Sequence, residues 1–76
     1  GLIPEDRGAL IAMVRADSPA FELGFRTGQV ITQIGDLRVT EPLDVYGALA
    51  EMRRGSSPVL VIAEDGETRR LQIQPP

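Results

Sequence analysis

The stretch that decides the fold is residues 17–31, Asp-Ser-Pro-Ala-Phe-Glu-Leu-Gly-Phe-Arg-Thr-Gly-Gln-Val-Ile. The Ser18-Pro19 pair suits a helix start, because serine caps helices and proline is tolerated in the first turn. Gly24 suits the helix end, where a residue often adopts the left-handed conformation. These signals predict a helix of one or two turns. A helix this short is not stable alone, so we expect Phe21, with Leu23, to anchor it in the core.

Predicted strands lie on both sides of this helix. The run Ala9–Arg15 is almost entirely apolar, which is typical of a strand buried on both faces in the middle of a sheet. Residues Arg26–Gly28 predict a turn, and Gln29–Ile34 predict the next strand. Gly35-Asp36 favours a tight reversal, because both residue types tolerate positive φ, and Leu37–Val39 then returns as a short strand.

The longest predicted helix spans roughly Glu41–Arg53, with Thr40 as its cap and Gly55 at its exit. Apolar residues at helical spacing cover more than one of its faces, whereas a helix that only packs on a core needs a single stripe. The inward face is expected to carry Val45, Ala48 and Met52. The second apolar edge is expected to carry Pro42, Tyr46 and Leu49.

The C-terminal part of the chain predicts a hairpin. Pro58 opens an apolar strand, Val59–Ala63, and Asp65-Gly66 is the strongest short turn signal in the chain. The return strand, Thr68–Gln74, alternates, with Leu71 and Ile73 inward and with Arg70, Gln72 and Gln74 outward. The order of elements predicts an α+β fold, a small antiparallel β-barrel or sandwich of five or six strands capped by one short and one long helix.

Several motifs in this order resemble the bacterial type of PDZ domain. They are Gly-Ala-Leu-Ile at 8–11, Val14, Asp-Ser-Pro-Ala at 17–20, Gly-Phe-Arg-Thr-Gly-Gln-Val-Ile at 24–31, and Val39. The departures are Leu23 where the family usually has Ala, Thr27 for Pro, Gln29 for Asp, and Gly35-Asp36 for Asn-Gly. None of them moves an element. We expect residues 1–76 to be a single PDZ-like domain, a fragment of a longer protein, in which 1–3 are the remnant of a groove strand that Pro4 stops.

The resemblance implies that the chain binds the C-terminal tail or an extended hydrophobic segment of another protein. In such domains the ligand adds as a strand to an open sheet edge beside the long helix. The peptide-binding residues that the resemblance implies are Gly1, Leu2, Ile3, Pro42, Tyr46 and Leu49, with Tyr46 and Leu49 nearest the pocket for the last ligand side chain. Arg53 and Arg54 would attract the ligand carboxylate. The alternatives are core burial for Tyr46 and Leu49, and ordinary helix-end cations for the two arginines.

The composition of the chain argues against several classes of function, independently of the family resemblance. The 76 residues carry a net charge of −3, lack His and Cys, and draw all eight basic residues from Arg. Without His, Cys or Lys the chain has no ordinary nucleophile or neutral-pH base, and the adjacent carboxylates Glu5-Asp6 and Glu64-Asp65 are typical of solvated turns. We therefore expect no catalysis, cofactor or metal in this chain. Its acidic balance and few aromatic residues argue against nucleic acid as a partner, and it has no apolar run of about 18 residues that would insert in a membrane.

The resemblance also suggests the host protein. Bacterial PDZ domains of this sort accompany HtrA/Deg-type serine proteases, where they recruit substrates or regulate a protease domain of the same polypeptide in the periplasm or cell envelope. The alternatives are an assembly module of a type II secretion system and the PDZ domain of a site-2 metalloprotease or a C-terminal-processing protease. The flanking sequence would separate them, since an upstream His, Asp and Gly-x-Ser-x-Gly would indicate the serine protease.

Overall fold

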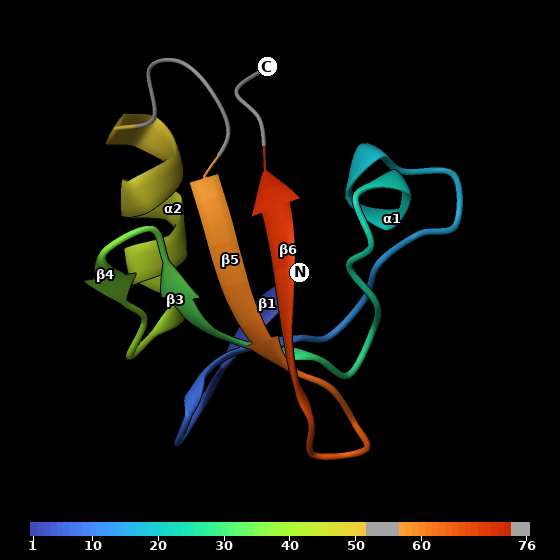
Figure 1. Ribbon diagram of the computed structural model, residues 1–76, viewed down its shortest axis with the longest axis horizontal. Coiled ribbons are helices and arrows are strands. Elements are labelled where there is room, and N and C mark those ends of the chain that lie inside the picture. Colours follow the sequence, from blue (N-terminus) through green and yellow to red (C-terminus); the bar gives the residue numbers. More distant parts are fainter. Residues whose placement is uncertain (52–56, 74–76) are drawn as a thin grey trace.

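The computed structural model describes residues 1–51 and 57–73, which form an antiparallel six-stranded sheet and two helices (Figure 1). The strand order is β1-β2-β3-β5-β6, and β4 pairs with β3 outside this path. The strands are β1 (Leu2–Glu5), β2 (Gly8–Ile11), β3 (Val30–Ile34), β4 (Leu37–Arg38), β5 (Ser57–Ile62) and β6 (Thr68–Ile73), and the helices are α1 (Pro19–Glu22) and α2 (Pro42–Glu51). The predicted α+β fold class is confirmed. Within residues 1–51 and 57–73, no helix is long and apolar enough to cross a bilayer.

Strand β2 is internal, as predicted, but ends earlier than the apolar run suggested. It pairs with β1 on one side and β3 on the other, and the strand stops at Ile11. Beyond it, the Ala12 N–H donates to the carbonyl of Gly1 at 2.8 Å, and the Val14 N–H donates to Thr27 Oγ1 at 2.9 Å. The Ala12 bond continues the pairing with β1 by one residue, and at Val14 a side-chain oxygen takes the place of a neighbouring strand.

Close backbone packing between β2 and β3 requires a glycine at position 8. Gly8 has a φ of 153°, and a Cβ there would lie 2.1 Å from the carbonyl oxygen of Ile31. No side chain fits at that distance, so the backbone at the start of β2 can approach β3 this closely only with glycine at position 8.

Helix α1 begins as predicted but is anchored differently. Ser18 caps it by accepting a hydrogen bond from the Phe21 N–H at 3.3 Å. The prediction that Phe21 and Leu23 hold the helix in the core was wrong, because Phe21 is only half-buried, 3.5 Å beneath the Arg26 guanidinium, and Leu23 is 38% exposed. The core side chain is Phe25, at 7% exposed. Helix α1 has only four residues, which complete a single turn. The backbone then changes direction at Gly24, which has a positive φ, and the next residue, Phe25, enters the core.

Helix α2 begins at Pro42, and its N-terminus is held by Asp44. The Asp44 carboxylate accepts hydrogen bonds from the Thr40 N–H and hydroxyl, both at 2.9 Å, and from the Glu41 N–H at 3.3 Å. The prediction that Thr40 caps this helix is therefore wrong. A capping side chain accepts a hydrogen bond from a backbone N–H, whereas the Thr40 hydroxyl donates one to the Asp44 carboxylate. Val45 is 5% exposed and Ala48 packs against the core, as predicted. The expected helix end, with Met52, Arg53 and Gly55, lies outside the described residues.

The hydrogen bonds at Asp44 predict acid sensitivity. The backbone N–H of Thr40, followed by its hydroxyl, holds the pKa of Asp44 below its ordinary value. A lowered folded-state pKa stabilises the fold above the unfolded pKa, and this contribution disappears as pH falls through the folded pKa. We expect the free energy of unfolding to fall below about pH 4, and Asp44→Asn to be less stable at neutral pH and to lose part of this acid dependence. Thermal unfolding of both proteins between pH 2 and pH 7 measures it; parallel curves would contradict the assignment.

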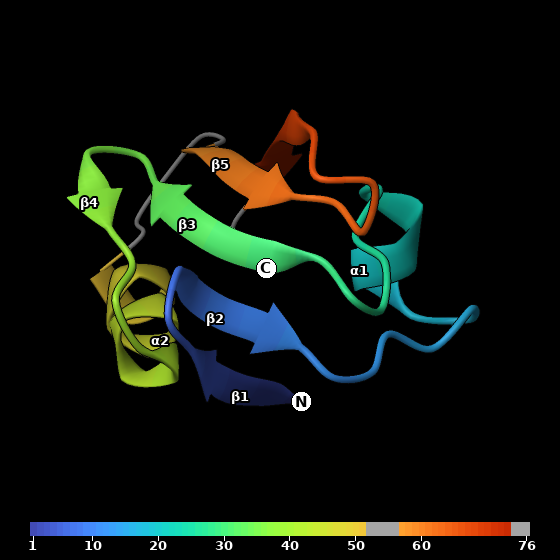
Figure 2. The ribbon, with the colours of Figure 1, turned by 90° about the horizontal axis from the view of Figure 1, so that it is seen from below.

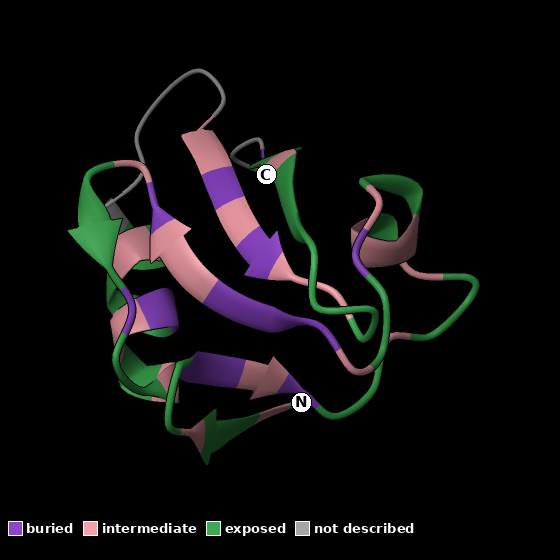
Figure 3. Cartoon of the chain, turned by 60° about the horizontal axis from the view of Figure 1, so that its bottom comes forward, coloured by how far each residue is buried: buried purple, intermediate pink, exposed green. Residues whose placement is uncertain are grey.

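The core lies between the sheet and the helices, and Figure 3 shows its buried residues concentrated in β2, β3 and β5. Val30, Val39, Val59 and Val61 are fully buried, and the burial of each side chain contributes about 1.5–3 kcal/mol to the stability of the fold.

The predicted C-terminal hairpin is confirmed. The Gly66 N–H donates to Ala63, the Ala63 N–H donates to Glu67, and Gly66 has a φ of 85°.

Candidate functional site

Strand β1 forms one edge of the sheet. Its register places Leu2 opposite Ile11 and Glu5 opposite Gly8, and within the described residues β2 is its one strand partner. Figure 2 shows β1 at the border of the molecule, next to β2 and on the same side as α2. The prediction that pairing stops at Pro4 was wrong, since β1 continues to Glu5. Proline is tolerated in an edge strand where its missing N–H faces outward.

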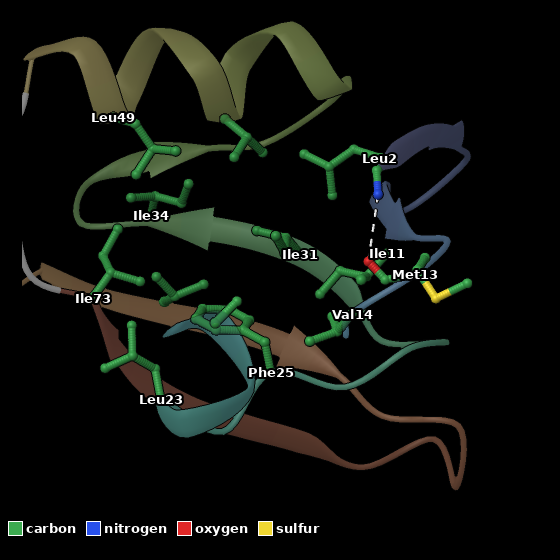
Figure 4. Close-up of a pocket in the computed structure, with 14 residues that line it drawn as sticks. Leu2, Ile11, Met13, Val14, Leu23, Phe25, Ile31, Ile34, Leu49 and Ile73 are labelled. Atoms are coloured by element: carbon green, nitrogen blue, oxygen red, sulfur yellow. Dashed lines mark hydrogen bonds between the residues drawn. The ribbon is translucent and has the colours of Figure 1, made fainter. Parts of the chain in front are cut away.

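A cavity of about 320 Å³ lies beside this edge. Figure 4 shows Leu2 from β1 and Leu49 from α2 pointing into it, above Ile31 and Ile34 of β3, with Phe25 and Leu23 on the far side. The complete lining is Gly1, Leu2, Ile11, Met13, Val14, Ala20, Leu23, Phe25, Ile31, Ile34, Val45, Leu49, Val59 and Ile73. Apart from Gly1, which has no side chain, every one of these residues contributes an apolar side chain, so the cavity suits an apolar group.

Charged groups lie at the far end of β1 from the cavity. The Glu5 carboxylate accepts from the Arg7 N–H at 2.8 Å and pairs with the Arg7 guanidinium at 2.9 Å. The Arg7 N–H, more than any other contact, lowers the pKa of Glu5. This local network fixes the β1–β2 turn. Among residues 1–51 and 57–73, no group of three or more acidic side chains gathers in a way that could hold a metal ion.

A second depression, of about 470 Å³, lies on the outward side of the sheet and is lined by polar and charged residues together with two apolar ones, Leu60 and Ile62. Leu60 and Ile62 alternate along β5 with the buried Val59 and Val61, which places them on the opposite face from the core. The rest of the lining is Asp6, Arg7, Thr32, Gln33, Arg38 and Thr68. This depression is the natural competitor to the apolar cavity in any binding experiment.

An open strand edge next to a helix and an apolar cavity is the arrangement that adds an extended peptide to a sheet. A family model described as PDZ domain matches residues 1–74. The chain belongs to the PDZ domain family.

The curated relatives of this PDZ domain include bacterial proteases. It is 31% identical over 93% of its length to the magnetosome formation protease MamE of Paramagnetospirillum magneticum. It is 25% identical over 93% of its length to a probable periplasmic serine endoprotease DegP-like of Brucella suis, and 26% identical over 95% to the protein of that name in Rhizobium meliloti. The chain spans 10%, 14% and 14% of the length of these relatives.

The structure brings together some of the residues expected to bind peptide. Gly1, Leu2 and Leu49 line the cavity. Ile3, at 45% exposed, alternates with Leu2 and so lies on the other face of β1. Pro42 and Tyr46 lie on α2 outside the cavity lining, and Tyr46 is 53% exposed. Arg53 and Arg54 lie outside the described residues.

The cavity also includes residues that sequence reasoning did not assign to a site. Met13 and Leu23 are large apolar side chains that remain 63% and 38% exposed; Met13 borders the cavity next to Leu2 and Ile11, and Leu23 borders it directly after α1 (Figure 4). Val45 lines it from within the core. The available signal was Leu23, an apolar residue where the family usually has a smaller one. The cavity is therefore broader than the space between β1 and α2, because it extends to α1.

Proposed function

We propose that this PDZ domain binds an extended apolar segment, such as the C-terminal tail of another protein, as an added strand on β1. The observation that carries the proposal is the position of the apolar cavity directly beside the open edge. Side chains on directly opposed residues of an antiparallel pair point to the same face. A ligand residue opposite Leu2 would thus direct its side chain into the cavity that Leu2 and Leu49 line.

We further propose that the domain serves a bacterial envelope protease without catalysing the reaction itself. The support is that its relatives are named proteases, two of them periplasmic, and that the chain covers a small part of each. Catalysis would then belong to a separate domain of the same polypeptide, and this domain would recruit substrate to it or regulate it. An HtrA/Deg-type serine protease of the periplasm or cell envelope is the host that fits the DegP-like relatives.

A titration tests the binding role. The probe is the acetylated pentapeptide Ser-Ser-Val-Ala-Val with a free carboxylate, added to the isotope-labelled chain. We expect dose-dependent amide shifts at Leu2, Ile3, Tyr46 and Leu49, with an affinity near micromolar, because a ligand of this size makes a small interface.

Two control peptides sharpen this titration. Ser-Ser-Ser-Ala-Ser should not shift these signals, because it lacks the apolar side chains. The amidated form of the probe measures the contribution of the carboxylate, including any attraction by Arg53 and Arg54. Shifts confined to the hairpin of β5 and β6 would reject the groove.

A further inference from the structure

The hydrogen-bonding phase of β1 determines which backbone groups face the open edge. The Ala12 N–H donates to the Gly1 carbonyl at 2.8 Å, and hydrogen-bonded and non-hydrogen-bonded pairs alternate along an antiparallel ladder. Ile3 is therefore bonded to Leu10, whereas Leu2 and Pro4 direct their backbone groups away from β2. Ile11, opposite Leu2, confirms the phase, because its N–H and carbonyl bond to Gln29 and Gly28 on the β3 side at 2.8 and 2.9 Å.

Pro4 makes this edge incomplete. Proline has no N–H, so the outward row of β1 consists of the Leu2 N–H, the Leu2 carbonyl and the Pro4 carbonyl. The next residue in the same phase is Asp6, which already lies in the turn before β2. The edge thus offers one donor and two acceptors, where a regular strand of this length offers two of each.

We propose that Pro4 is a specificity-determining residue of this groove, one that leaves Leu2 as the one residue of β1 that can form a complete backbone pair with an added strand. This inference rests on the proposed binding of an extended peptide to β1. We take the ligand as antiparallel, like every pair in the sheet. Its residue opposite Leu2 both donates and accepts, whereas its residue opposite Pro4 donates its N–H but finds no donor for its carbonyl.

The ligand requirement follows from this pattern. The N–H groups of the residues opposite Leu2 and Pro4 are both needed, because each has a carbonyl to bond. The N–H of the ligand residue between them points away from β1. The site would therefore accept proline or an N-methylated residue at that middle position and reject it at the two positions beside it.

The test restores the missing donor. Pro4→Ala places an N–H at the edge, and we expect it to bind the Ser-Ser-Val-Ala-Val probe about three- to tenfold more tightly than the unaltered chain, the effect of one added hydrogen bond. The matched control is a chemically synthesised chain with N-methylalanine at position 4, which has the alanine side chain without the N–H. It should bind like the unaltered chain. Equal affinity of Pro4→Ala and this control would overturn the proposal.

Methylated probes test the ligand side. N-methylation of either valine should weaken binding at least about tenfold, whereas N-methylation of the alanine between them should change it by less than about twofold. The reverse pattern would contradict the inferred phase. Self-association of Pro4→Ala without tighter peptide binding would instead assign Pro4 to blocking edge-to-edge pairing between copies, and would overturn the proposal.

The two proposals fail differently. If the probe shifts the Leu2 and Leu49 signals but its affinity is the same for Pro4→Ala and for every methylated peptide, peptide binding in the groove is supported and the role of Pro4 is rejected. If the probe leaves the Leu2 and Leu49 signals unshifted in every variant, both proposals are rejected.

Discussion

Replacing Leu49 with aspartate is expected to abolish peptide binding while leaving the domain folded. Leu49 lines the cavity from α2 and is 45% exposed. Its side chain is therefore available to contact a ligand and is not needed to fill the core. A carboxylate there would have to lose water when an apolar side chain enters, and the apolar contact itself would be lost. We expect affinity for Ser-Ser-Val-Ala-Val to fall at least about 30-fold, or about 2 kcal/mol, measured by calorimetry or by the shift titration.

The same helix supplies the control for Leu49→Asp. Leu43 is 69% exposed and lies outside the cavity lining, so Leu43→Asp adds the same charge to α2 without entering the site. It should bind peptide within about twofold of the unaltered chain, since an exposed single charge acts weakly in water. Equal losses from Leu43→Asp and Leu49→Asp would mean that net charge, not the cavity, governs affinity.

Val45→Asp is expected to unfold the domain. Val45 is 5% exposed and belongs to the core cluster of the sheet and α2. A carboxylate buried there without a partner would cost more than about 4 kcal/mol, against a total stability of roughly 4–11 kcal/mol for a chain of 76 residues. Circular dichroism and the dispersion of amide signals measure the outcome.

The pair of α2 variants tests which of the two residues lies deeper. A folded Val45→Asp protein that has lost only binding, together with an unfolded Leu49→Asp protein, would mean that Leu49 and not Val45 is the residue buried in the core. Four residues along a helix bring a side chain to nearly the same angle, so the contrast depends on the depth of each residue and not only on its direction. The exposed fractions of 5% and 45% define that difference in depth.

Local signals in the sequence were sufficient for much of the fold. The Ser18 cap, the Asp65-Gly66 turn and the helical spacing of Val45 and Ala48 each depend on residues within a few positions of one another. Such short-range patterns carry their own physical cause, so they predict structure without knowledge of the tertiary fold. The motifs that resembled PDZ domains then gave the order in which the elements assemble.

The remaining features depend on contacts between distant parts of the chain. Whether Pro4 ends a strand depends on which side of β1 is open, and only the pairing with β2 decides this. Gly8 is required by the carbonyl of Ile31, which lies one strand away. The Asp44 carboxylate, by contrast, was within reach of sequence reasoning, because it lies three positions after Glu41, the residue before the helix, and a side chain at that spacing can accept from the backbone N–H there.

The candidate site was predicted in part for the same reason. Leu2 and Leu49 were assigned through the family resemblance, and they do meet at one cavity. Met13, Leu23 and Phe25 come from the segment between β2 and β3, and no periodicity in the sequence connects that segment with α2. A cavity built from several separate segments becomes visible only when the chain is folded.

The most direct test of strand addition to β1 is a scalar coupling across a hydrogen bond in the peptide complex. With nitrogen labelled in the domain and carbonyl carbon labelled in the bound peptide, the Leu2 amide should show a coupling to the ligand residue opposite it. The Leu2 amide should also become protected from hydrogen exchange. Binding without that coupling, with protection confined to Thr32, Gln33 and Thr68 around the second depression, would contradict strand addition.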